Sequence, residues 1–166
     1  MVKPPVHGSK ETMTTAQALR DSPIEALEQL YREAPARPAP PRRFRGEVLH
    51  RVDTPFARSA AITALLVPFE RAPFGVDFVT RTWFFFHPRL RVGHFRVEPG
   101  RSRWRDTEAL LMRYDVSRLP IRGVLYDEVK PLGDTLCLAL GGLDFERGTG
   151  DLFFFLLEAM PFEVTG

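Results

Sequence analysis

Four apolar segments follow one another in the second half of the chain: ALLMRYDV (109–116), IRGVLYDEVK (121–130), TLCLAL (135–140) and LFFFLLE (152–158). Each has the length and the aliphatic and aromatic content that are typical of a β-strand. The separators are short and rich in turn-forming residues, among them Pro120, Gly133, Asp134, Gly148 and Gly150. Because strands joined by short turns pair with their neighbours in antiparallel order, these segments predict a β-meander.

The strand pattern extends upstream of this region. Further strands are expected over 44–52, 78–86 and 90–97, and no βαβ alternation interrupts them. A meander of six or seven strands has two edges, and closing it into a barrel removes both. The triplets Phe84–Phe86 and Phe153–Phe155 place rings on both faces of their strands. One face therefore fits a barrel interior, and the other needs a cover.

Two helices are expected to supply that cover. The segment Ser22–Glu25 has the form of a capping box with Pro23 at the first helical position, and it starts a helix that runs to about Ala34. A second helix is expected over 56–69, ended by Pro68 and Pro73. The predicted fold is mainly β: an antiparallel up-and-down meander closing into a barrel, with an N-terminal helix and a second short helix. Residues 1–41 form a tail, helix and Pro-rich spacer, and residues 42–166 form the barrel domain.

Length and composition indicate one ordinary globular domain. The chain has 166 residues, of which 44% are hydrophobic and 27% charged. No uncharged apolar run reaches the length of a transmembrane helix, and residues 1–10 lack the apolar core of a secretory signal. A cytoplasmic protein without a transmembrane segment is therefore expected. The single cysteine, Cys137, excludes an internal disulfide.

Charge is distributed unevenly along the chain, although the net charge is only +2. Residues 81–122 hold ten arginines and four acidic residues, whereas residues 123–166 hold two basic and eight acidic residues. Opposite charges on neighbouring strands stabilise a sheet. Because the arginine-rich part also lacks a continuous basic run, we expect the two parts to pair with each other and expect no nucleic-acid partner.

Several features between residues 102 and 158 match a known pattern: Tyr114-Asp115 at a strand end, the Leu119-Pro120 break, the strand segment 126–129, the Gly133-Asp134 turn, Gly141-Gly142, and the closing aromatic strand 153–158. In these features the chain resembles an uncharacterised family of bacterial lipocalin-like proteins. Some members carry a Gly-x-Trp-x-Gly signature, where this chain has Phe44-Arg45-Gly46. The resemblance implies a lipocalin-like barrel that holds a small lipophilic ligand, and it implies no particular reaction.

Asp127 is the most informative polar residue of the predicted barrel. It alternates with Gly123, Leu125 and Val129, so its face of the strand is otherwise apolar and we expect it to be mostly buried. A buried carboxylate needs a partner, which we expect to be an arginine such as Arg81 or Arg113, or else several backbone or hydroxyl donors. Two roles stay open: a structural tie between strands, or a polar anchor at the bottom of a ligand cavity.

Ligand cavities combine aromatic side chains with a few placed polar groups. The ligand-binding residues predicted on that basis are Trp83, Phe85, His94, Arg113, Tyr114 and Asp127. Cys137 lies between two leucines without a neighbouring base and is expected to be an inert core thiol. The histidines have no spacing that brings two of them onto one face, so neither a metal nor another cofactor is expected. Catalytic residues cannot be assigned.

Three functions remain open at this point. The first is binding of a small hydrophobic or amphipathic ligand in the barrel cavity. The second is an enzyme of the isomerase, cyclase or dehydratase type, acting on a lipid- or polyketide-like substrate with Asp127 or His94 as general base. The third is a protein-interaction module, in which the apolar stripe over residues 24–31 docks on a partner or on a second copy to form a homodimer.

Overall fold

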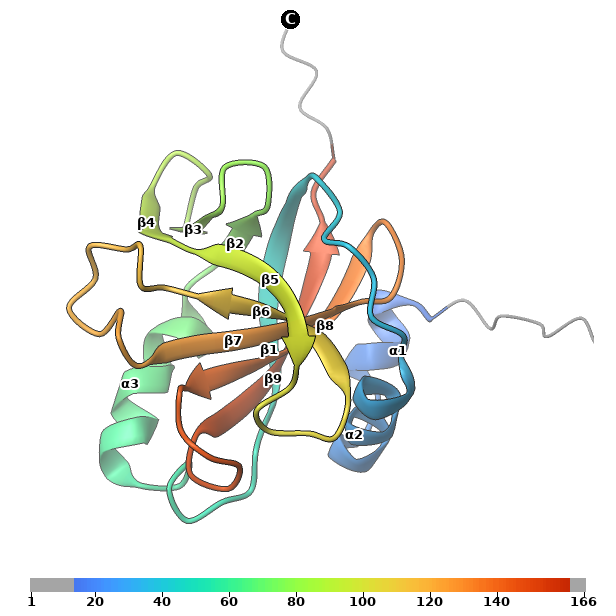
Figure 1. The fold of residues 1–166 in the computed structure, drawn as a ribbon, viewed down its shortest axis with the longest axis vertical. Coiled ribbons are helices and arrows are strands. Elements are labelled where there is room, and N and C mark those ends of the chain that lie inside the picture. The colour runs from blue at the N-terminus through green and yellow to red at the C-terminus, as the bar shows by residue number, and fades with distance from the viewer. Residues whose placement is uncertain (1–13, 162–166) are drawn as a thin grey trace, which may run out of the picture.

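The computed structural model describes residues 14–161, which form one antiparallel sheet and three helices (Figure 1). The helices are α1 (Ala16–Arg20), α2 (Ile24–Glu33) and α3 (Ala60–Arg71). The strands are β1 (Arg43–Arg51), β2 (Phe74–Asp77), β3 (Thr82–Phe85), β4 (Arg91–His94), β5 (Arg96–Arg101), β6 (Glu108–Arg113), β7 (Leu125–Pro131), β8 (Leu136–Leu143) and β9 (Asp151–Ala159).

The sheet curls into a nearly closed barrel. Its hydrogen-bonded order is β4-β3-β2-β1-β9-β8-β7-β6-β5, so the first strand pairs with the last and the other neighbours are consecutive in the chain. The two edge strands, β4 and β5, are separated by Phe95 alone, and its buried side chain packs in the barrel core. The chain itself therefore bridges the remaining seam. The predicted mainly-β, up-and-down barrel with a few helices is confirmed.

Two apolar cores lie on the two faces of this sheet. The inner core holds one set of alternating residues, such as Phe153, Phe155 and Cys137. The outer core holds the other set, such as Phe154 and Leu138, and there Leu27 and Tyr31 of α2 cover the sheet. The rings of Tyr31 and Phe154 meet edge to face with centroids 6.0 Å apart. The aromatic triplet thus contributes to both cores, as the alternation of a strand requires.

The helices differ in what they cover. Helices α1 and α2 lie against the outer face of the sheet (Figure 1), so the apolar stripe of α2 is occupied within the chain. Helix α3 instead closes one end of the barrel, because Ile62 and Leu66 point into the inner core. Within residues 14–161, no helix is both long and apolar enough to span a bilayer.

Two predicted strands were placed wrongly. The run 78–86 is not one strand, because the chain reverses at residues 78–81 between β2 and β3. Asp77 Oδ1 accepts hydrogen bonds from the backbone N–H groups of Val79 and Thr80, which stabilises this turn. The run 90–97 also divides, because residues before Phe95 pair with β3 and residues after it pair with β6.

Both helix starts also differ from the prediction. The Ser22 hydroxyl donates to the Ala18 carbonyl at 2.6 Å and does not cap α2, whose N-cap is Pro23. The second helix begins at Ala60, four residues later than expected, because Thr54 caps a separate turn and Ser59 caps α3. Pro68 lies inside α3, which continues to Arg71.

Candidate functional site

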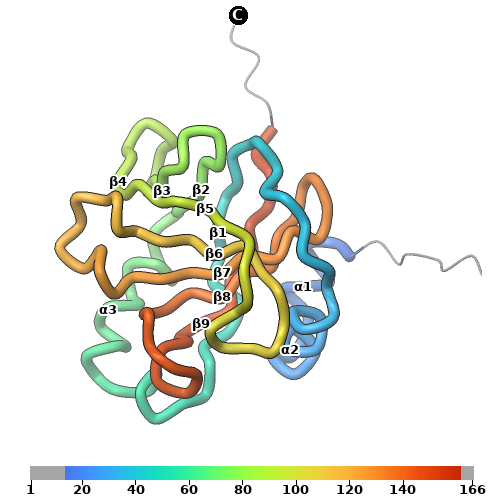
Figure 2. Tube along the Cα trace, viewed as in Figure 1, coloured from blue at the N-terminus to red at the C-terminus, as the bar shows by residue number. Residues whose placement is uncertain are grey.

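An apolar cavity of about 180 Å³ lies at the end of the barrel that α3 covers. Helix α3 forms one wall, and the rest comes from β3, β4, β7, β8, β9 and the connection between β6 and β7. Leu65, Val92 and Ile121 line the cavity and are also exposed at the surface. The cavity therefore opens to solvent between α3, β4 and the β6–β7 connection, which lie together on one side of the molecule (Figure 2).

Three polar side chains line this cavity, and they form one hydrogen-bonded chain. Trp83 Nε1 donates to Tyr114 Oη, and Tyr114 Oη donates to Asp127 Oδ2 at 2.5 Å. Trp83 comes from β3, Tyr114 follows the last residue of β6, and Asp127 lies on β7. The other lining side chains are apolar. The cavity is thus an apolar chamber with a single carboxyl group in its wall.

Burial determines the electrostatics of this carboxyl group. Asp127 is 3% exposed, and desolvation raises its pKa to about 7 because the charged form is the one that burial disfavours. Hydrogen bonds from Tyr114 and from the Gly142 backbone oppose the rise, and the charge of Glu128 adds to it. Burial also raises the pKa of Tyr114 well above its usual value, so its hydroxyl remains a donor. Asp127 can therefore gain or lose a proton close to neutral pH.

The structure brings four of the six predicted ligand-binding residues together. Trp83, Phe85, Tyr114 and Asp127 all line the cavity. Asp127 is buried on the inner face, as its alternation predicted. Of the two partners expected for its carboxylate, the arginine is not found; the described contacts come instead from the Tyr114 hydroxyl and the Gly142 backbone, which is the hydroxyl-and-backbone alternative.

Arg113 and His94 lie outside the cavity, and strand register explains both. Arg113 pairs with Tyr126 on β7, one residue before Asp127, so it shares the outward face. Its guanidinium lies over the Tyr126 ring at 5.2 Å and bonds Glu98 at 2.9 Å. The β3–β4 register slips between Trp83 and Phe84, which breaks the alternation expected for β4. As a result, Gly93 faces the cavity and His94 is exposed.

A second buried polar cluster lies on the opposite face of β7, beneath α2. Glu128 is fully buried and accepts hydrogen bonds from Tyr31 Oη at 2.9 Å, Tyr126 Oη at 3.0 Å and the Arg103 N–H at 2.6 Å. Nearby, the buried Lys130 donates to the Ala34 carbonyl at 2.7 Å. Of the three donors to Glu128, Tyr126 lies on β7 itself, whereas Tyr31 comes from α2 and Arg103 from the segment after β5. This cluster attaches α2 and the segment after β5 to the barrel and does not reach the cavity.

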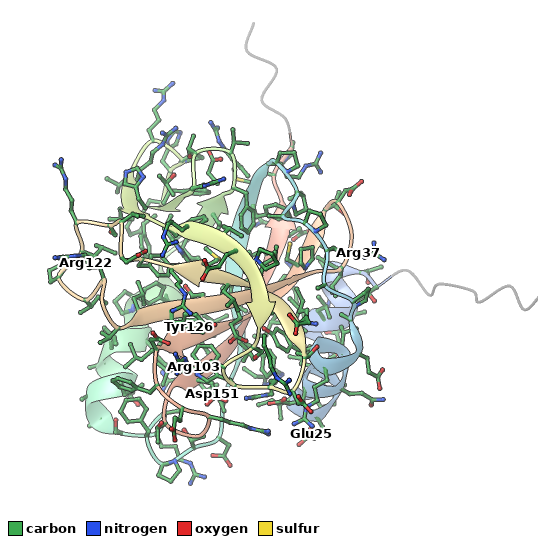
Figure 3. All side chains as sticks on the ribbon, in the orientation of Figure 1. Glu25, Arg37, Arg103, Arg122, Tyr126 and Asp151 are labelled. Carbon is green, nitrogen blue, oxygen red and sulfur yellow. The ribbon has the colours of Figure 1, made fainter. Side chains whose placement is uncertain are left out.

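An arginine completes this attachment. Arg105 is buried, and its guanidinium contacts both Glu28 of α2 and Asp151 at the start of β9, the latter at 2.7 Å. Figure 3 labels Asp151 together with Arg103 and Tyr126 in this part of the molecule. Arg103 forms an ion pair with Asp144, with Nε 2.6 Å from Oδ1. The arginine-rich and acidic parts of the chain do pair, as their opposite charges predicted.

The sequence analysis did not predict that Glu128 and Arg105 are buried or that each attaches α2 to the barrel. The available signal was the alternation itself, because Glu128 follows Asp127 and must face the other side of the sheet. Whether that side is covered depends on where α2 packs, which no local pattern states. Cys137, by contrast, lies in the inner core as expected, and burial raises the pKa of its thiol. Among residues 14–161, no three His, Cys, Asp or Glu side chains are grouped as metal ligands.

Fold and site together describe a mainly-β barrel protein with an apolar cavity at one end. The chain matches no protein-family model and no curated protein sequence. Among solved structures it is similar to a protein from Thermomonospora curvata, with 17% sequence identity and a TM-score of 0.52. The similarity covers 84% of this chain and 89% of that one. At this level of identity, the similarity shows the fold alone.

Proposed function

We propose that this protein binds a small, uncharged or cationic lipophilic molecule in the cavity beside Asp127. The observation that carries the proposal is the composition of the cavity wall, in which one buried carboxyl group is surrounded by apolar side chains. Ligand sites commonly have this composition, because apolar walls supply affinity and a few polar groups fix orientation. The lipocalin-like character of the barrel, which the sequence resemblance implies, is part of the same proposal.

The charge of the ligand follows from what lines the cavity. No arginine or lysine is among the described lining residues, and Arg113 is bound on the outer face. A carboxylate ligand would therefore be desolvated beside Asp127 without a compensating cation, which is unfavourable. A hydroxyl, a carbonyl or an ammonium group can instead form a hydrogen bond with Asp127. Fatty acids and other anions are thus disfavoured as ligands.

The size of the ligand follows from the volume. An engineered apolar cavity of about 150 Å³ is known to hold benzene, so about 180 Å³ suits one substituted ring or a branched chain of similar bulk. Because the cavity opens between α3 and the β6–β7 connection, a longer ligand can extend into the mouth. The polar group of the ligand that contacts Asp127 must then be on the part of the ligand enclosed in the cavity.

Three probes of one shape test the proposal. Benzyl alcohol, benzylamine and benzoate differ chiefly in the charge of the head group, and their binding is measured by calorimetry at about pH 8, where Asp127 is mostly ionised. We expect both benzyl alcohol and benzylamine to bind roughly tenfold or more tightly than benzoate. Equal affinities for the three probes would contradict the proposed head-group selectivity.

A cavity-filling variant locates the binding. Leu143→Trp places an indole in the cavity wall and should abolish binding of benzyl alcohol. Leu132→Trp is the matched control, because Leu132 is equally half-buried but packs against the outer core. Binding that survives Leu143→Trp would place the ligand elsewhere. Native mass spectrometry of protein purified without denaturation, followed by extraction, then identifies the bound molecule, and a fatty acid there would contradict the proposal.

One observation favours catalysis as a second candidate. A carboxyl group with a pKa of about 7 in an apolar cavity has the properties of a general acid or base. The other two polar side chains of the described lining offer no spare donor to a developing oxyanion, because Trp83 donates to Tyr114 and Tyr114 donates to Asp127. Binding is therefore the better-supported function. Turnover of an extracted ligand that is lost in Asp127→Asn, with binding retained, would establish catalysis instead.

A further inference from the structure

Exposed apolar side chains surround the mouth of the cavity. Leu65, Val92 and Ile121 line the cavity and reach the surface. Phe86 and Leu90, between the lining residues Phe85 and Val92 in the chain, and Val116, two residues after the lining Tyr114, are exposed as well. These residues come from three segments: α3, the region from the end of β3 to β4, and the β6–β7 connection. A soluble surface rarely groups large apolar side chains in this way unless something binds there. We call these six residues the mouth ring.

Phe86 is the most exposed member of the mouth ring and has an unfavourable backbone. Its side chain is 70% exposed, and its φ of 58° lies in the left-handed region that bulky residues seldom adopt. The Phe86 N–H donates to the Pro73 carbonyl at 2.6 Å, which holds this conformation. The fold therefore maintains a locally unfavourable backbone at the position where an aromatic ring is directed into solvent.

Four arginines are interleaved with the mouth ring. Arg89, Arg91, Arg118 and Arg122 are all exposed, and none forms an ion pair with a carboxylate of residues 14–161. Figure 3 shows Arg122 at the outer edge of the molecule, on the β6–β7 connection. The two carboxylates in these segments are already paired with arginines outside them: Asp115 with Arg96 at 2.7 Å, and Glu70 of α3 with Arg51 at 2.5 Å. The surface around the mouth is thus both apolar and cationic, whereas arginines elsewhere commonly have acidic partners.

An anionic lipid bilayer has the chemistry that complements both features. Lipid phosphates attract arginines near the surface, and apolar side chains enter the boundary between head groups and acyl chains. The mouth ring consists of side chains on separate loops and a helix, a shape suited to insertion. We propose that this mouth docks on the anionic surface of a bilayer. The inference goes beyond ligand binding and stands on exposure and charge alone.

Vesicle binding tests this docking directly. The full chain is sedimented with vesicles of phosphatidylcholine containing about a quarter phosphatidylglycerol, or of phosphatidylcholine alone, at about 50 and about 500 mM NaCl. We expect binding to the anionic vesicles at low salt, at least tenfold weaker binding to the neutral ones, and weakening at high salt. An absence of binding to anionic vesicles at low salt would overturn the proposal.

Matched variants separate docking from general attraction. Arg118→Gln/Arg122→Gln should weaken binding more than tenfold, given roughly fivefold for each arginine near the surface. Arg45→Gln/Arg101→Gln makes the same change in net charge on β1 and β5, away from the mouth, and should change binding less than threefold. Equal losses in the two double variants would overturn the proposal, because the attraction would then depend on net charge alone.

Phe86→Ser tests the apolar half of the surface. It should weaken vesicle binding at both salt concentrations, since insertion does not depend on charge screening, while binding of benzyl alcohol in the cavity remains. Thermal unfolding checks that the variant is folded.

If the wild-type chain instead forms a dimer that Phe86→Ser dissociates, and does not bind vesicles, the mouth ring is an interface with a second copy and the membrane proposal is wrong. Failure of the vesicle experiment leaves the probe experiment unaffected, so the two proposals are distinguishable.

Discussion

The hydroxyl of Tyr114 donates a 2.5 Å hydrogen bond to Oδ2 of Asp127, and both side chains are buried in the wall of the cavity. Because the tyrosine lies beyond the end of β6 and the aspartate in the middle of β7, this bond joins the β6–β7 connection to the barrel. Asp127 therefore has two properties that can be measured separately. Its burial affects the stability of the fold, and its charge affects what the cavity binds.

The free energy of unfolding of Asp127→Asn should increase relative to that of wild type as pH rises. The folded carboxyl has a pKa of about 7 and the unfolded one about 3.8, so between these values the folded state holds more protons and wild-type stability falls with pH. Asparagine does not titrate. The difference in unfolding free energy between variant and wild type should therefore grow by about 4 kcal/mol from about pH 3.5 to above pH 7. Urea unfolding at several pH values measures it.

Asp115→Asn is the control for that pH dependence. The Arg96 guanidinium hydrogen-bonds the exposed Asp115 carboxyl and lowers its pKa, so its contribution to stability is lost as pH falls. Its difference from wild type should be small and should change with pH in the opposite direction. If Asp127→Asn gives a flat difference across the range, the carboxyl is not desolvated and the cavity assignment is wrong.

Tyr114→Phe should raise the pKa of Asp127 further. The phenol stabilises the ionised carboxylate, and hydrogen bonds to charged groups contribute about 1.5–3 kcal/mol, so its removal should raise the pKa by roughly one to two units. Titration of the Asp127 carboxyl carbon by NMR measures the shift. Tyr126→Phe is the matched control, because that phenol bonds Glu128 on the opposite face. An unchanged Asp127 pKa in Tyr114→Phe would contradict the hydrogen bond.

Much of this fold could be predicted from local patterns. Alternation of side chains assigned Asp127 to the inner face, and the ring triplet Phe153–Phe155 to both faces, because the two-residue period of a strand is a local property. The short turns predicted the antiparallel order, because turn length and composition are also local properties of the sequence. The prediction of one strand over 78–86 failed because this run is rich in β-branched and aromatic residues, which favour strands, whereas the turn within it depends on the side chain of the preceding Asp77.

The site was harder to predict because it depends on register and on helix placement. Whether Arg113 or Tyr114 meets Asp127 is decided by a pairing of β6 with β7 that places Met112 opposite Asp127. A slip of one residue would exchange the two faces. His94 was assigned to the cavity because nothing in the sequence marks the slip near Val92. The cavity itself exists because α3 covers one end of the barrel, which is a tertiary contact.

Ligand binding should depend on pH in a way that reveals the head group. Acetophenone only accepts hydrogen bonds, so it should prefer protonated Asp127 and bind roughly tenfold more weakly at about pH 8 than well below pH 7. Benzylamine donates and is cationic, so its affinity should rise over the same interval. Calorimetry at each pH measures both. Asp127→Asn should flatten both profiles, and a pH dependence that persists in this variant would assign it to another group.

Arg105→Ala should destabilise the protein more than any exposed arginine variant. The buried guanidinium contacts Glu28 of α2 and Asp151 of β9, and without it the fully buried Asp151 carboxylate keeps only the Gly148 N–H among the described partners. Leaving a buried charge uncompensated costs about 3–5 kcal/mol. Arg101→Ala removes an exposed ion pair with Asp106 and should cost less than about 1 kcal/mol.

Urea unfolding compares the stability of Arg105→Ala with that of Arg101→Ala. The double variant Arg105→Ala/Asp151→Asn should recover part of the loss, because the unpaired charge is then absent. Equal losses in Arg105→Ala and Arg101→Ala would show that this ion pair does not attach α2 to the barrel.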